Sequence, residues 1–141
     1  DREGKLDMTV TNTTSDNVSV FRNQSTIGII DATSFAPAVS LSTTGTQPES
    51  VTAVDLDGDG YPEIIANHNT SPFISVFKNN SSPGTISPAT FSAPITFTGN
   101  AGRKISYADF EGSGKPTLLT GGLNTRAYRN LCTISYSSTL I

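Results

Sequence analysis

The sequence is poor in the residues that usually build catalytic and disulfide-bonded sites. It has one cysteine, one histidine and no tryptophan among 141 residues. The single cysteine, Cys132, excludes an intrachain disulfide framework and a zinc site of several thiolates, and we expect it to be a small apolar residue of the last repeat. A Ser-His-Asp triad or a multi-histidine metal site would have to be built around His68. Because His68 lies among asparagines and threonines, we expect it to be a solvated loop residue.

Charged and hydrophobic residues are also scarce. Charged residues make up 15% of the chain, and the formal net charge is only −3. The basic patch that nucleic-acid binding requires is therefore missing. Hydrophobic residues make up 35%, and no run approaches the roughly 18 apolar residues of a membrane-spanning helix. Ser, Thr, Asn, Gly and Pro take their place, and no window has helical periodicity with caps. The composition predicts a β-rich, turn-rich protein with neither a nucleic-acid partner nor a membrane span.

The sequence matches itself when it is shifted by 56 positions. Residues 1–8 align with residues 57–64, and residues 18–23 align with residues 74–79. There are 12 identities over 42 ungapped positions, and apolar residues align with apolar residues. This match indicates a structural repeat rather than shared composition.

A third copy begins with a shift of 54 positions. Residues 109–116 align with residues 55–62, and the motif Ala-Tyr-Arg-Asn at 127–130 aligns with Val-Phe-Lys-Asn at 76–79 after a short deletion. We therefore expect a single region, 1–141, built from about two and a half repeats. Their approximate bounds are 1–54, 55–108 and 109–141.

Each repeat contains four short strand signals. In the second repeat they are residues 50–55, 63–67, 73–78 and 91–98, separated by Asn-, Ser-, Pro- and Gly-rich turns. Four strands in a unit of this length are typical of a propeller blade. The apolar run Ile64-Ile65-Ala66 suits a strand covered on both faces. The expected fold class is all-β, with β-propeller-like blades of four antiparallel strands forming a partial propeller.

Four carboxylates gather in nine residues of the second repeat. Asp55, Asp57 and Asp59 occupy positions 1, 3 and 5 of a tight loop, Glu63 closes it at position 9, and the carbonyl of Tyr61 is the expected ligand at position 7. Carboxylates at this spacing repel one another, and a hard divalent cation removes the repulsion. Calcium accepts six to eight oxygens at flexible angles, so it fits better than magnesium. The sequence therefore predicts a main Ca²⁺ site here.

This loop differs from an EF-hand loop, although both begin with Asp-x-Asp-x-Asp-Gly. The EF-hand needs glutamate at position 12, where this sequence has Ala66 inside a predicted strand. The loop is thus a shorter connection between two strands. The alternative is an Asp/Gly-rich β-turn without metal, which gives no reason for the additional acids.

The other two copies of the loop are less complete. In the first copy, positions 3, 5, 7 and 9 give a partial Ca²⁺ site, held by Asp1, Glu3, the carbonyl of Lys5, and Asp7. The third copy keeps two carboxylates and replaces the other two, with Asp109, Glu111, Ser113 and Thr117 at positions 1, 3, 5 and 9. Loss of two carboxylates weakens calcium affinity, so we expect the third loop to hold no metal.

The loop followed by these strands resembles the FG-GAP and VCBS repeat families, the calcium-loop propeller blades of integrin α-subunits and large secreted bacterial proteins. The resemblance covers nearly the whole chain and is most specific over residues 55–67 and 74–79. By this resemblance the calcium ligands are Asp55, Asp57, Asp59, Tyr61 and Glu63. The Phe-Gly and Gly-Ala-Pro signatures are poorly kept at 35–37 and 91–94, which favours the bacterial VCBS-like branch. The resemblance implies an extracellular or cell-surface setting, a structural calcium, and a role in adhesion or ligand display.

These observations favour a non-catalytic module of a larger secreted protein. No constellation supports catalysis, because nearly all clustered acids belong to the metal loops. The alternative is a carbohydrate-binding module appended to a secreted polysaccharide-active enzyme, with tyrosines that stack on sugars: Tyr61, Tyr107, Tyr128 and Tyr136. The absence of tryptophan counts against it. The protein or glycan ligand is not indicated by the sequence.

The repeat also bears on whether the chain can form a closed propeller by itself. A propeller ring needs at least four blades, whereas 141 residues supply about two and a half. Open blade edges tend to pair with other strands. We therefore expect either an excerpt of a longer propeller or a homo-oligomer that pairs through these edges.

Overall fold

The computed structural model describes residues 1–99, 101–122 and 124–132. Apart from one short 3₁₀ turn, η1 (Pro88–Thr90), the regular elements of this part are all strands. They form three antiparallel sheets. The first contains β1 (Met8–Asn12), β2 (Asn17–Phe21) and β3 (Val39–Ser42); the second contains β4 (Pro48–Val54), β5 (Glu63–His68), β6 (Phe73–Phe77) and β7 (Ile95–Thr98); the third contains β8 (Gly102–Ala108), β9 (Thr117–Gly122) and β10 (Arg126–Tyr128).

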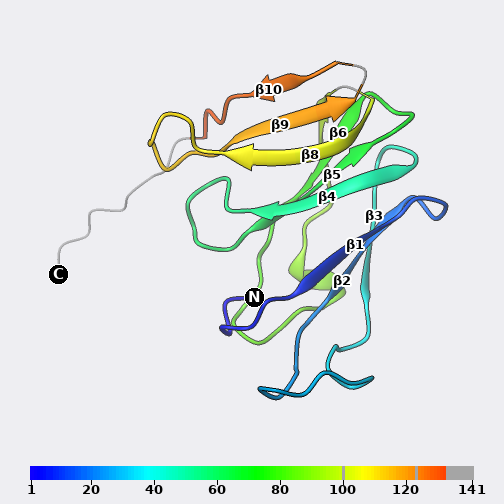
Figure 1. The fold of residues 1–141 in the computed structure, drawn as a ribbon, viewed down its shortest axis with the longest axis vertical. Coiled ribbons are helices and arrows are strands. Elements are labelled where there is room, and N and C mark those ends of the chain that lie inside the picture. Colours follow the sequence, from blue (N-terminus) through cyan, green and yellow to red (C-terminus); the bar gives the residue numbers. More distant parts are fainter. Residues whose placement is uncertain (100, 123, 133–141) are drawn as a thin grey trace.

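The strands of each sheet follow one another in the order of the sequence. The orders are β1-β2-β3, β4-β5-β6-β7 and β10-β9-β8. Figure 1 shows the second sheet between the other two, with β4 next to both β1 and β8. The expected all-β fold of propeller-like blades is therefore confirmed. The four-stranded blade is present in the second sheet, while the first and third sheets have three strands each within the described residues.

The sequence repeat has the same strand register in two sheets. Val18 on β2 pairs with Leu41 on β3, and the residues 56 positions later, Ile74 and Phe97, pair in the same way on β6 and β7. Val10 pairs with Ser19 in the first sheet as Ala66 pairs with Ser75 in the second. The repeat found in the sequence is thus a repeat of backbone hydrogen bonding as well as of residue type.

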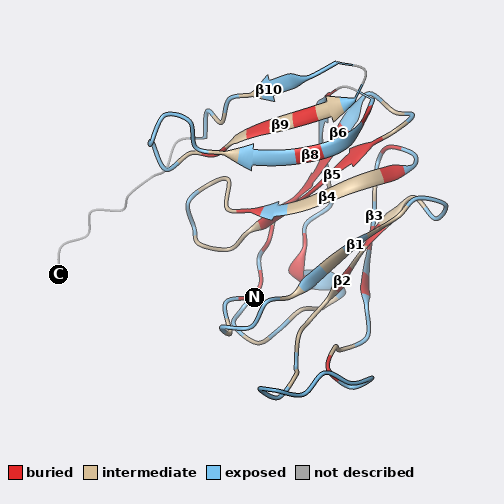
Figure 2. Cartoon of the chain, in the orientation of Figure 1, coloured by how far each residue is buried: buried red, intermediate tan, exposed pale blue. Residues whose placement is uncertain are grey.

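The core lies between neighbouring sheets. Ile64 and Ala66 face the first sheet and pack with its apolar residues, which are Val18, Val20, Val39 and Leu41. Ile65, between them on β5, faces the third sheet and packs with Ile105 and Leu118. All six residues of β5 are buried (Figure 2). The prediction from the apolar run is confirmed, since alternate side chains of this strand serve two different interfaces.

The predicted strand over residues 91–98 is too long. β7 begins at Ile95, and Phe91 instead makes an isolated bridge to Asn79. Pro94 precedes the strand and has no N–H to give to a ladder, so regular pairing starts only after it. Phe91 is nevertheless buried in the core between the first two sheets.

The expectation for His68 was wrong. Its side chain is fully buried at the end of β5, and Nδ1 lies 2.9 Å from the carbonyl oxygen of Phe73. The ring fits against Gly45, where a Cβ atom would lie 2.7 Å from His68 Cγ. Burial was possible because the glycine leaves room for the imidazole.

Cys132 was also placed wrongly, because it is exposed after β10 rather than packed in the last blade. Tyr136 lies outside the described residues. Among the described residues, no helix has the length and apolar character that crossing a membrane requires.

Candidate metal centre

The loop between β4 and β5 is folded around Asp55. Its Oδ1 accepts a hydrogen bond from the N–H of Gly58 at 2.7 Å, and its Oδ2 accepts one from the N–H of Gly60 at 2.8 Å. Both glycines have positive φ, 80° and 84°, a conformation that other residues adopt only with strain. The alternation of Asp and Gly in the sequence therefore produces the tight turn, with the first carboxylate at its centre.

The three aspartates of this loop lie close enough to share one cation. Each offers a carboxylate oxygen, and the oxygens of Asp55, Asp57 and Asp59 lie within 4.8 Å of one another. Asp59 also accepts a hydrogen bond from the N–H of Tyr61 at 2.8 Å, which fixes its orientation. The Arg2 guanidinium lies over the Tyr61 ring, with Arg2 Cζ 5.0 Å from the ring centroid.

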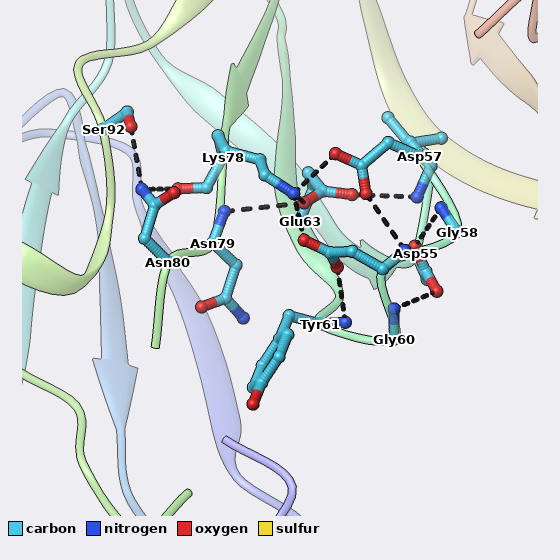
Figure 3. A network of polar contacts seen from close by, with 12 residues as sticks. Asp55, Asp57, Gly58, Gly60, Tyr61, Glu63, Lys78, Asn79, Asn80 and Ser92 are labelled. Atoms are coloured by element: carbon cyan, nitrogen blue, oxygen red, sulfur yellow. Dashed lines mark hydrogen bonds and ion pairs between the residues drawn. The ribbon is translucent and has the colours of Figure 1, made fainter. Parts of the chain in front are cut away.

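The ammonium group of Lys78 lies among these acids (Figure 3). Lys78 Nζ is 2.5 Å from Asp57 Oδ2, contacts Asp59 Oδ2, and is 3.4 Å from Glu63 Oε1. Desolvation acts to lower the pKa of Lys78, but its hydrogen bonds to Asp57 and Asp59 raise that pKa overall. Desolvation likewise acts to raise the pKa of Asp59, and the hydrogen bond from Lys78 lowers it overall. A positive charge at this point stabilises the clustered carboxylates.

Glu63 lies behind the three aspartates and is 3% exposed. Its Oε2 accepts a hydrogen bond from the N–H of Leu56 at 2.8 Å, and its Oε1 accepts one from the N–H of Asn79 at 3.5 Å. Burial raises the pKa of Glu63 above its usual range. Glu63 therefore links the two ends of the loop to the end of β6. Its Oε1 also lies beside the Lys78 ammonium group.

The first loop brings a second set of three carboxylates together. Ligand oxygens of Asp1, Glu3 and Asp7 also lie within 4.8 Å of one another. Asp7 Oδ1 accepts a hydrogen bond from the N–H of Asn23 at 2.9 Å, and its Oδ2 accepts one from the Asp1 amino group at 3.0 Å. The Asp1 side chain has no exposed area. Asp1 Oδ2 and Glu3 Oε1 are buried and accept no hydrogen bond within the described part of the chain. Two buried carboxylate oxygens without partners are costly unless a cation binds them.

Comparison with known proteins gives one match. Residues 1–66 match the family model of the FG-GAP-like repeat. Residues 1–66 are thus similar to an FG-GAP-like repeat. The expected resemblance to FG-GAP repeats is thereby confirmed, and the matched range includes both carboxylate sets. No curated protein and no solved structure matches the chain.

The third loop is arranged differently from the first two. Asp109 accepts hydrogen bonds from the N–H groups of Glu111, Ser113 and Gly114, at 3.3, 3.1 and 2.7 Å. These bonds, the one from Gly114 foremost, lower the pKa of Asp109. Glu111 pairs with Arg129 Nη2 at 2.8 Å. Both acids of this loop thus have partners of their own, and the loop does not form a set of three metal-ligating side chains.

A pair of residues that follows three equivalent strands, β2, β6 and β10, was not singled out from the sequence. A basic residue and an asparagine occur there as Arg22-Asn23, Lys78-Asn79 and Arg129-Asn130. The Asn23 and Asn79 side chains donate to the carbonyls of Leu6 and Pro62, at 3.0 and 2.9 Å, so each holds the loop of its own repeat. Asn130 differs, because it donates to the carbonyl of Leu56 in the preceding loop, at 2.7 Å. The alignment of these pairs with one another was the signal that could have identified them.

Proposed function

We propose that the chain is a calcium-binding, non-catalytic FG-GAP-like repeat module of a larger extracellular protein. The observation that carries this proposal is that two equivalent loops each gather three carboxylates, with ligand oxygens within 4.8 Å of one another. Equivalent positions in a repeat are not expected to repeat an acidic cluster unless the cluster has a common role.

The donor set fits a hard cation. In the second loop the ligands are the carboxylates of Asp55, Asp57 and Asp59, with the Tyr61 carbonyl and Glu63 completing the set. In the first loop they are Asp1, Glu3 and Asp7, with the Lys5 carbonyl. Oxygen donors of this kind suit Ca²⁺, which tolerates irregular geometry better than Mg²⁺ does. The buried, unpartnered oxygens of Asp1 and Glu3 support the same conclusion.

The role of the metal is to stabilise the fold. Each loop leads into a strand of a blade, and the second connects β4 to β5, the strand buried on both faces. A cation that neutralises the carboxylates and binds only the folded loop stabilises the folded state by mass action. The third loop holds no metal in this proposal, because hydrogen bonds and Arg129 satisfy its two acids.

The module works in adhesion, scaffolding or ligand display in a secreted bacterial protein, as the family resemblance suggests. Its partner is a protein or a glycan, or a second copy of the chain. Among the described strands, β1 has a neighbour on one side only, whereas its equivalent β5 pairs on both sides, and an unpaired edge favours pairing with another strand. Light scattering at several concentrations tests for the homo-oligomer.

A chelator experiment tests the calcium proposal. We expect EDTA to lower the melting temperature of the wild-type chain by about 5–10 °C, since saturating calcium adds about 2–3 kcal/mol of stability. Asp57→Asn removes a large part of this difference. Glu111→Gln, at the same position of the third loop, is the matched control and leaves the difference unchanged. If EDTA leaves the melting temperature of the wild type unchanged, the proposal is wrong.

A further inference from the structure

Each repeat carries a basic residue directly after a strand, at equivalent positions of the three copies. Arg22 follows β2, Lys78 follows β6 and Arg129 follows β10. Each contacts the acidic loop of its own repeat: Arg22 reaches Glu3 at 3.3 Å, Lys78 reaches the second loop, and Arg129 reaches Glu111 at 2.8 Å. A cationic side chain is therefore a common part of the loop.

The three basic residues differ in how much of the loop they occupy. Arg22 and Arg129 each pair with one carboxylate. Lys78 instead contacts three, Asp57, Asp59 and Glu63, and its ammonium lies where these side chains converge (Figure 3). All three of these acids belong to the proposed calcium site, at positions 3, 5 and 9 of the loop. The Lys78 side chain is 30% exposed, so it has room to move toward solvent.

We infer that Lys78 is a built-in competitor of the divalent cation in the second loop. This inference rests on the proposed calcium function. The ammonium donates hydrogen bonds to carboxylate oxygens that a metal ion would also use, and two cations cannot occupy one set of lone pairs. Lys78 therefore stabilises the loop when calcium is scarce and lowers the calcium affinity of this loop when calcium is present.

The first loop provides an internal comparison. Arg22 contacts only Glu3 Oε2, and it leaves Asp1 Oδ2 and Glu3 Oε1 without partners. The basic residue of this loop neutralises one acid without taking the remaining oxygens. Removal of the Arg22 charge should therefore change calcium affinity less than removal of the Lys78 charge.

Calorimetric titration of the full chain with CaCl₂ tests the inference. Lys78→Gln and Lys78→Met should each raise the calcium affinity of one site about tenfold. This effect is smaller than the full Coulomb repulsion between two cations at this distance, because the lysine side chain can move into water. The same variants should melt at a lower temperature than the wild type in EDTA, because their carboxylates lose a counter-charge. Melting in saturating calcium confirms that both variants are folded.

Three variants serve as controls. Lys78→Arg keeps the charge and should stay close to the wild-type affinity. Arg22→Gln should change the calcium affinity by less than threefold, because Arg22 contacts one carboxylate whereas Lys78 contacts three. Lys104→Gln on β8 tests for a general effect of charge.

The outcomes separate this inference from the proposed function. If the wild type binds calcium and both Lys78 variants bind it equally well or more weakly, the competitor role is overturned while the calcium function stands. If only the Lys78 variants bind, the competitor role is supported and the calcium function of the native chain is rejected. If neither wild type nor variant binds, both are overturned.

Discussion

Asn67 and Gly102 join the second and third sheets by a buried hydrogen bond. Asn67 Nδ2 on β5 donates to the Gly102 carbonyl on β8 at 3.0 Å, and also to the Lys104 carbonyl at 3.3 Å. Asn67 is fully buried. The pairing of β8 with β9 shifts register between Gly102 and Lys104, so this amide satisfies carbonyls at the point where the regular ladder is interrupted.

Replacement of Asn67 by alanine should destabilise the chain by about 1–3 kcal/mol, because two carbonyls at the interface of the sheets lose their donor. Urea unfolding followed by circular dichroism measures the change. Asn69→Ala, on the loop after β5, is the control and should stay within about 0.5 kcal/mol of the wild type. Equal stability of the two variants would mean that the sheets do not depend on the buried amide.

A second prediction concerns the room that Gly45 leaves for His68. The added Cβ of Gly45→Ala would lie 2.7–2.9 Å from three atoms of the imidazole ring, which is held by the Phe73 carbonyl. We expect a loss of about 1–3 kcal/mol from this overpacking. Gly121→Ala is the matched control, because its Cβ would come no closer than 3.9 Å to Lys104. Similar melting temperatures for both variants would contradict the tight fit of His68.

The repeat and most of the strands could be predicted from the sequence because they depend on local patterns. The run Ile64-Ile65-Ala66 predicts a strand covered on both faces without any knowledge of its neighbours, and the Asp/Gly alternation after Val54 predicts the tight turn. The beginning of β7 could also have been found, since Pro94 cannot donate to a ladder. These features are encoded within a few residues of where they act.

The burial of His68 and the position of Lys78 could not be predicted in the same way. The burial of His68 depends on Gly45, which belongs to another strand connection and carries no pattern of its own. Lys78 reaches Asp57 because β6 returns antiparallel to β5, and this places its end beside the loop. Contacts of this kind are decided by the tertiary fold, and only the repeated basic-Asn pair hinted at them.

A third prediction concerns the pKa of Asp31 in the loop after β2. The Thr33 hydroxyl and N–H donate to Asp31 Oδ1 at 2.7 and 2.8 Å, and these bonds lower the pKa of Asp31 below its usual value. A depressed pKa stabilises the folded state at pH values above the unfolded pKa of about 3.9, and the contribution is lost as the pH falls through the folded value. NMR titration should show the Asp31 pKa rising toward its usual value in Thr33→Val. Thr26→Val is the control, and an unchanged Asp31 pKa in Thr33→Val would contradict the role of the hydroxyl.

The last prediction is the number of calcium ions bound. Since two loops gather three carboxylates each, we expect two ions per chain in calorimetric titration. Glu3→Gln removes the charge from a carboxylate whose Oε1 is buried and accepts no hydrogen bond within the described residues, and it should weaken one site at least tenfold. Asp57→Asn should weaken the other site, because each lost carboxylate lowers Ca²⁺ affinity. The double variant should bind no calcium in the same range, and Glu111→Gln should keep both sites. If the wild type binds one ion and Glu3→Gln still binds it, calcium binds to the second loop alone. If the wild type binds one ion and Asp57→Asn still binds it, calcium binds to the first loop alone.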